Sequence, residues 1–181
     1  DRPVTVNKTG GLITVADVSN IGSTRAFTLT AGNMTVNAAL TALGAFTFTA
    51  GNLSANSAVL TTGAFTHTAG TLITNGTGTG NTQAYTQNGG NIILTGGDLV
   101  TTTFTSSTST ARTIQFGTSN INATSTGTVV NMATTANCTV TGTGNINITN
   151  NGSTAITVTP GALAEANSIN YNVIAGNYPL T

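Results

Sequence analysis

Hydrophobic and polar positions alternate along this chain in a phrase that recurs, and the pattern predicts short β-strands. In the segment AFTLTAGNMTV, four apolar residues occupy every second position of two runs: Phe27, Leu29, Met34 and Val36. A period of two is typical of a strand with one buried and one exposed face. Gly32 separates the two runs and predicts a turn, because glycine tolerates a positive φ angle. We therefore expect two strands here, followed by a short third segment over residues 40–43.

The phrase repeats at an almost fixed interval. It reads AFTLTAGN from residue 26, AFTFTAGN from 45, AFTHTAGT from 64 and AYTQNGGN from 84, and a weaker echo, TFTSSTS, begins at 103. One aromatic residue marks each copy, in steps of 19, 19, 20 and 19 residues: Phe27, Phe46, Phe65, Tyr85 and Phe104. Such a period indicates a repeat architecture. We expect these five aromatic residues to form a ladder inside the fold.

The length of the phrase selects one kind of repeat. At about 3.3 Å per residue, some 19 residues bent at two or three turns close one coil, and stacked coils bring parallel strands about 4.8 Å apart. A propeller blade needs about 40 residues, and threonine-rich segments without helical periodicity argue against helical repeats. The sequence therefore predicts an all-β fold, a parallel β-helix (β-solenoid) of about six to eight coils.

Beyond Phe104 the period becomes irregular. GTSNINATS over 117–125 matches GTGNINITN over 142–150 at a step of 25, and Cys138 with Val140 maps onto Ile156 with Val158 at a step of 18. The longer step predicts coils with inserted loops. We divide the chain into an N-terminal strand pair or cap over 1–23, a solenoid over 24–159 and a C-terminal segment over 160–181.

The two terminal segments look like caps or like strands that pair with another molecule. We expect strands over Val4–Val6 and Leu12–Val15, joined through residues 8–11, and one helical turn in PGALAEAN from residue 160. A last alternating strand follows near residue 170. The candidate intersubunit residues are the apolar ones of the outermost strands: Val4, Val6, Ile169, Tyr171 and Val173.

Composition excludes several classes of partner. Charged residues are only 4% of the chain, and the four bases cancel the four acids, so no basic patch exists to bind nucleic acid. No apolar run approaches the length of about 18 residues that membrane insertion needs. The apolar fraction is 38% and periodically placed, which favours a folded chain. A composition so poor in lysine and glutamate and so rich in threonine and asparagine is associated with extracellular or cell-surface proteins.

Candidate chemistry is sparse. The single cysteine, Cys138, rules out an intrachain disulfide framework and is interpreted as a small buried hydrophobe. His67 stands where other copies have Leu29, Phe48 and Gln87, without the additional ligands that a metal site requires. A glycosidase would need paired carboxylates, and nothing in the sequence brings Asp98 and Glu165 together. We therefore expect no enzyme activity, no cofactor and no metal.

If the aromatic residues point inward, threonines on either side of them point outward. Pairs of the form T-x-T then lie on three successive coils as a candidate contact face: Thr28, Thr30, Thr47, Thr49, Thr66 and Thr68. Such a flat grid resembles those of β-solenoid ice-binding proteins, although threonine is also favoured on any exposed strand. Eight sequons would accept glycans outside the cell: Asn7, Asn33, Asn52, Asn75, Asn122, Asn137, Asn147 and Asn151.

Phrases such as AFTFTAGNLSANSAVLTTG and AYTQNGGNIILTGGDLV resemble the repeats of bacterial secreted β-helix proteins, including filamentous-haemagglutinin-like and autotransporter-type adhesins. The resemblance covers roughly residues 24–159 and implies a structural or adhesive role at a cell or virion surface. Because a solenoid has two open ends, we expect a structural subunit of an extracellular filament, sheath or surface fibre that joins its own copies head to tail. An adhesin module is the alternative, and an ice-binding protein the third possibility.

Overall fold

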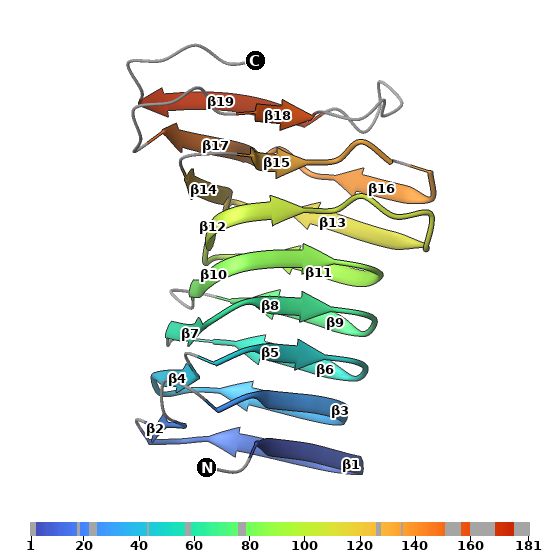
Figure 1. The fold of residues 1–181 in the computed structure, drawn as a ribbon. Coiled ribbons are helices and arrows are strands. Elements are labelled where there is room, and N and C mark those ends of the chain that lie inside the picture. Colours follow the sequence, from blue (N-terminus) through green and yellow to red (C-terminus); the bar gives the residue numbers. More distant parts are fainter. Residues whose placement is uncertain are drawn as a thin grey trace.

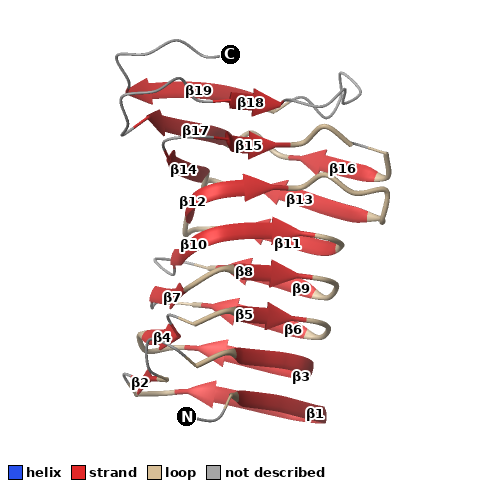
Figure 2. Ribbon diagram, in the orientation of Figure 1, coloured by secondary structure: helices blue, strands red, loops and turns tan. Residues whose placement is uncertain are grey.

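The computed structural model is a column of stacked parallel strands (Figure 1). It describes residues 3–17, 19–21, 25–42, 44–56, 59–75, 79–125, 128–134, 136–150, 157–159 and 169–175. The described residues contain strands, turns and loops but no helix (Figure 2). The column has about 7 turns of about 21 residues each, which confirms the predicted parallel β-solenoid. The helical turn expected over 160–167 lies outside the described residues.

Each coil presents three strand faces. The first face contains the start of β1 (Val4–Val15), the start of β3 (Phe27–Val36), β5 (Phe46–Phe48), β8 (Phe65–His67), the ends of β10 (Thr79–Gln87) and β12 (Leu99–Thr105), β15 (Thr128–Asn131) and β18 (Thr157–Thr159). The second face contains the ends of β1 and β3, then β6 (Asn52–Ala55), β9 (Thr71–Thr74), β11 (Gly90–Leu94), β13 (Arg112–Phe116) and β16 (Cys138–Thr141).

The third face closes the coil. It contains β2 (Ser19–Asn20), β4 (Leu40–Ala42), β7 (Val59–Thr62), the starts of β10 and β12, β14 (Ile121–Ser125), β17 (Asn145–Asn150) and β19 (Asn170–Ala175). Every described pairing between these strands is parallel. Because each strand pairs with its equivalent in the coil before and the coil after, side chains of one position form a column that runs along the molecule.

The core is the inside of the coil. The aromatic residues of the first face are all buried, and their rings stack with centroids 4.7, 4.7, 5.1 and 5.8 Å apart: Phe27, Phe46, Phe65, Tyr85 and Phe104. On the second face Met34, Leu53, Leu72 and Ile92 form a parallel buried column. Inward columns of large apolar side chains thus bury the surface that stabilises the stack.

The register of the later coils departs in part from the prediction. The step of 25 holds, since β14 pairs along its whole length with residues 146–150 of β17. However, β16 pairs with β13, which places Val140 beside Ile114, and β18 pairs with β15, which places Val158 beside Val130. The predicted mapping of Val140 onto Val158 is therefore wrong, because these residues belong to different faces. Alternating valine and threonine recur on every face and do not identify which face a strand occupies.

The N-terminal segment also differs from the prediction. Instead of two strands joined by a loop, β1 runs continuously from Val4 to Val15 and pairs with β3 at both ends. Between its pairs Asn7↔Ala31 and Leu12↔Asn33, β1 takes five residue steps where β3 takes two. The extra residues form a bulge, which lets a longer segment turn the same corner.

Candidate functional surfaces

A glycine column fixes the corner between the first and second faces. Gly32, Gly51, Gly70 and Gly90 all have positive φ angles, between 74° and 96°. A Cβ atom on Gly51 would collide with the carbonyl oxygen of Gly32, and one on Gly70 would collide with that of Gly51. Only glycine therefore allows successive coils to stack at this corner.

The six candidate threonines lie on the outside of the first face, half-exposed or exposed. Thr28, Thr47 and Thr66 pair directly with one another across three coils. The same column begins at Thr5 and continues through Thr86 and Thr105. By strand geometry such a grid has spacings of about 4.8 Å between coils and about 6.7 Å along each strand.

The second column of the grid is Thr30, Thr49 and Thr68. The backbone amides of Thr49 and Thr68 donate to the carbonyls of Leu29 and Phe48 in the preceding coil. These hydrogen bonds keep the second column in register from coil to coil. Within the described part of the chain, the hydroxyls of the six threonines make no hydrogen bond to protein. Their hydroxyls are therefore available to water or to a ligand.

Asparagine side chains form separate ladders along the surface. Asn75 donates to Asn56 and Asn56 to Asn37, at 3.1 and 3.0 Å, at one corner of three successive coils. Asn52 donates to Asn33 at 3.0 Å. On the third face Asn172 donates to Asn147, Asn147 donates to Asn122, and Asn122 donates to the carboxylate of Asp98. Apart from the bond to Asp98, these hydrogen bonds link equivalent positions in neighbouring coils and so help to keep the coils in register.

The ladders involve most of the predicted glycosylation sequons. Among the sequon asparagines, the side-chain amides of five take part in ladders: Asn33, Asn52, Asn75, Asn122 and Asn147. Asn137 lies in a turn with a φ of 58° and donates to the carbonyl of Ser109 at 2.9 Å. Asn7 is exposed on the bulge of β1, and Asn151 lies outside the described residues. Glycan attachment stays a prediction.

His67 has a structural environment. Its side chain is fully buried beside Tyr85, whose hydroxyl lies 2.7 Å from the Nδ1 atom. The Nε2 atom lies 3.3 Å from the carbonyl oxygen of Gly70. Burial lowers the pKa of His67 from 6.5 to about 4, against the opposing effect of hydrogen bonds to the backbone at Gly70 and Ala69. The neutral imidazole accepts from the Tyr85 hydroxyl and donates from Nε2, so both ring nitrogens are satisfied.

Asp98 and Cys138 are also held within the fold. The Asp98 carboxylate accepts from the backbone amide of Asn120 and from the Asn122 side chain, both at 2.8 Å. Glu165, the other carboxylate considered as its partner, lies outside the described residues. Cys138 is partly buried, and burial raises the pKa of its thiol despite the opposing effect of Arg112. In the described part of the chain no three His, Cys, Asp or Glu side chains gather as metal ligands.

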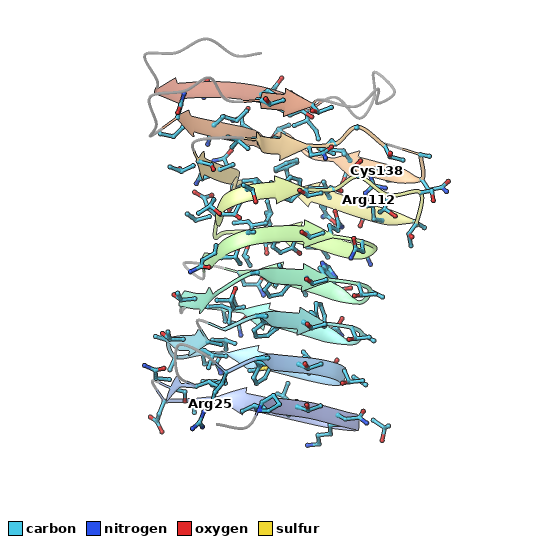
Figure 3. The ribbon with its side chains drawn as sticks, viewed as in Figure 1. Arg25, Arg112 and Cys138 are labelled. Carbon is cyan, nitrogen blue, oxygen red and sulfur yellow. The ribbon has the colours of Figure 1, made fainter. Side chains whose placement is uncertain are left out.

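Arg112 is a buried residue whose role the sequence did not predict. It pairs with Gly90 and so occupies the glycine corner position in a coil whose corner is enlarged by residues 106–111 (Figure 3). Its guanidinium donates to the Ser106 hydroxyl at 2.7 Å and to the carbonyls of Ser106 and Thr134 at 2.8 and 2.6 Å. It also contacts the carbonyls of Thr108, Thr110 and Ala136.

These bonds join two successive enlarged corners, over residues 106–111 and 132–137. No carboxylate contacts Arg112 among the described residues, so carbonyl dipoles and the Ser106 hydroxyl alone solvate its charge. The signal in the sequence was the step of 22 residues from Gly90, where earlier copies step by 19 or 20. A step of that size indicates an insertion but not the residue that fills it.

The candidate intersubunit residues lie at the two ends of the column. Val4 and Val6 are half-buried in β1, which pairs only with β3 among the described strands. At the opposite end, β19 pairs only with β17 and β18 only with β15 (Figure 1). Ile169 is buried, Tyr171 is half-buried with its hydroxyl 3.5 Å from the sulfur of Met132, and Val173 pairs with Ile148.

Comparisons with models of protein families, with curated proteins and with solved structures found no match to this chain. The described residues contain no pocket and no helix long and apolar enough to cross a membrane. The outward threonine columns, the enlarged corners and the two strand edges at the ends of the column are the surfaces considered below.

Proposed function

We propose that the protein is a structural subunit of an extracellular filament, sheath or surface fibre, whose copies assemble head to tail through the strands at the ends of the column. The observation that carries this proposal is that the terminal rungs, β1 at one end and β18 with β19 at the other, pair on one side only within the described residues. An unpaired strand edge presents a row of amide and carbonyl groups that pairs readily with another strand.

The side chains of the first rung support the same proposal. Five apolar residues point toward the core yet stay partly exposed, in contrast to the buried residues of the next coils: Val4, Val6, Ile13, Val15 and Ile21. Charges that would discourage pairing are scarce, since β1 contains only Lys8 and β18 and β19 contain none. A second copy stacked on this end would bury the partly exposed residues.

Electron microscopy and sedimentation of the purified protein test the proposal. We expect unbranched filaments in which strands lie across the axis, with a repeat of about 4.8 Å between rungs. The first face has eight rungs from β1 to β18, so a copy stacked on β18 gives an axial repeat of about 38 Å for one subunit. A single monomeric species at all concentrations, with no filaments in the images, would contradict the proposal.

An adhesin module is the second candidate, and the enlarged corners favour it. Residues 106–111 and 132–137 add to an otherwise regular surface, and Arg112 binds carbonyls in both. Loops held in this way suit recognition of a surface, and the repeats resemble those of secreted adhesins. A monomer that binds cells, and loses binding when these two loops are shortened to the length of residues 49–51, would favour this candidate over the filament.

Ice binding is the third candidate and rests on the threonine grid of the first face. The six grid threonines are in step across three coils, and their hydroxyls make no hydrogen bonds within the described residues. A measurement of thermal hysteresis tests this candidate. Growth of ice without any change in crystal shape or freezing point would remove it.

A further inference from the structure

We infer that the head-to-tail contact has a defined register, in which β1 of one copy pairs with β18 of the next, Val4 beside Val158, while β2 pairs with β19, Asn20 beside Asn172. This inference rests on the proposed function and specifies its interface. The evidence for it is that columns of equivalent residues run through the whole molecule. The first residue of each column matches the last residue of the same column in type.

The first face supplies two such columns. The inward column begins at Val4, passes through the five stacked aromatic residues and ends at Val130 and Val158. The outward column begins at Thr5, passes through Thr28 and its equivalents as far as Thr105, then through Asn131, and ends at Thr159. A copy placed on the end of β18 therefore sets valine on valine and threonine on threonine, as neighbouring coils already do within the chain.

The third face supplies another column on the same coil. It begins at Asn20, continues through Thr41, Thr61, Asn81 and Val100, and ends at Asn122, Asn147 and Asn172. In its last coils each asparagine donates from Nδ2 to the residue in the coil before it. The Oδ1 atom of Asn172 accepts no hydrogen bond within the described residues. A copy stacked on this end would continue the column and place Asn20 beside Asn172.

Strand direction selects a head-to-tail contact over a two-fold contact. All described strands pair in parallel, so a copy moved along the axis meets β18 with a strand of the same direction. A two-fold contact between two copies of β1 would be antiparallel, and the three faces would follow one another in opposite order around the coil. The faces of the two copies would then not align together.

The same requirement identifies the occupant as a second copy of this chain. Any partner that completes this end must offer two strands at once, on the first and third faces, with the direction and separation that one coil imposes. The opposite end of the chain itself meets that requirement, because its β1 and β2 already stack on β3 and β4 in the same way. A contact of this kind does not close and generates a linear polymer.

Cysteine cross-linking tests the register. In a Cys138→Ser background, Thr5→Cys and Thr159→Cys are combined in one chain, and the assembled protein is oxidised with glutathione disulfide. Parallel in-register strands place the two Cα atoms about 4.8 Å apart, within the range of about 4.4–6.8 Å that a disulfide needs. We expect a ladder of covalent oligomers on a non-reducing gel, which disappears on reduction. The pair Asn20→Cys with Asn172→Cys is expected to give the same ladder from the third face.

Matched controls separate the possible outcomes. Thr5→Cys combined with Thr66→Cys keeps one cysteine at the end but moves the other to the middle of the same column, and we expect no cross-link. A covalent dimer from Thr5→Cys alone would show a two-fold contact and overturn the inference. Filaments in the microscope without either cross-link would overturn the register and leave the proposed function standing. A monomer without filaments or cross-links would overturn both, provided that circular dichroism shows the variants to be folded.

Discussion

At the scale of single residues, the first face contains two kinds of inward side chain with different physical roles. The aromatic column stabilises the stack through buried area and through the stacking of each ring on its neighbours in the column. The neighbouring inward column changes from Leu29 and Phe48 to His67 and Gln87, so polar groups enter the interior. Each of these is buried with hydrogen-bond partners, as buried polar groups must be.

Phe46 tests the aromatic column, because its ring lies between those of Phe27 and Phe65 and is fully buried. Phe46→Ala should lower the free energy of unfolding by about 3–5 kcal/mol, through lost burial and the cavity that remains. Urea unfolding followed by circular dichroism measures the change. The outward neighbour Thr47→Ala serves as the control and should change stability by no more than about 0.5 kcal/mol. A loss below about 1 kcal/mol for Phe46→Ala would contradict the column.

His67 predicts a pH dependence of stability. Its folded-state pKa of about 4 lies below the ordinary value of 6.5, so the unfolded chain takes up the proton first as pH falls. The stability of the folded state is therefore fully present above about pH 6.5 and decreases as pH falls toward 4. The loss should reach about 3 kcal/mol at the lower end.

Unfolding titrations at several pH values measure this dependence against a matched variant. His67→Gln places the residue of the next copy, Gln87, at the same position and removes the titrating group. The variant should lose the pH dependence between 6.5 and 4 that the parent shows. Equal slopes for the two proteins in that interval would show that His67 does not cause the effect.

At the scale of elements, the corners decide where strands begin and end. On the first four copies a glycine with positive φ turns the chain between the first and second faces. In later coils the corner is enlarged, and Arg112 binds the loop carbonyls from inside. A corner interrupts the strand pairing and leaves backbone groups that need other hydrogen-bond partners. The tight glycine corner and the enlarged corner with Arg112 are two ways to meet this need.

Gly51 tests the tight corner. Gly51→Ala forces a side chain into a positive φ of 94° and against the carbonyl oxygen of Gly32, so it should destabilise the protein by at least about 1–3 kcal/mol. Gly10→Ala is the control, since a Cβ atom there meets nothing within 4 Å. Thermal unfolding of both variants measures the difference. Similar melting temperatures for the two would contradict the role of the corner glycine.

At the scale of the whole molecule, repetition creates both the stability and the open ends. Each coil is completed by its neighbours, and the first and last coils each lack one neighbour in the described chain. Within the column a coil buries both of its sides, whereas the first coil leaves the side of β1 partly exposed. A second copy stacked on each end, as proposed above, would give the terminal coils the same environment as internal ones.

Val6→Lys tests polymerisation at this scale. A lysine at this half-buried end position places a charge where a second copy would dock, so filaments should be lost while the monomer remains folded. Sedimentation velocity and negative-stain images measure the loss. Thr66→Lys, on the outside of a middle coil, is the control and should still polymerise. Undiminished filaments of the Val6→Lys variant would contradict assembly through the end of β1.

The sequence by itself determined the solenoid, the parallel stacking and the phase of the strands in the regular copies. It did so because the same alternation is written repeatedly at steps of 19 or 20 residues, and each copy strengthens the assignment of the others. The same alternation is ambiguous where the steps vary, and there the prediction placed Val140 and Val158 in one column although they lie on different faces.

Only the tertiary structure decided which face each later strand occupies, which polar groups meet inside and how the enlarged corners are filled. Those choices depend on contacts between residues far apart in sequence, such as Arg112 with Thr134 and His67 with Tyr85. No local sequence pattern predicts such pairs. The residues next to an arginine in the sequence do not show whether its side chain is exposed or is buried among carbonyl groups. The alignment of columns at the two ends of the molecule likewise follows from the stacking as a whole.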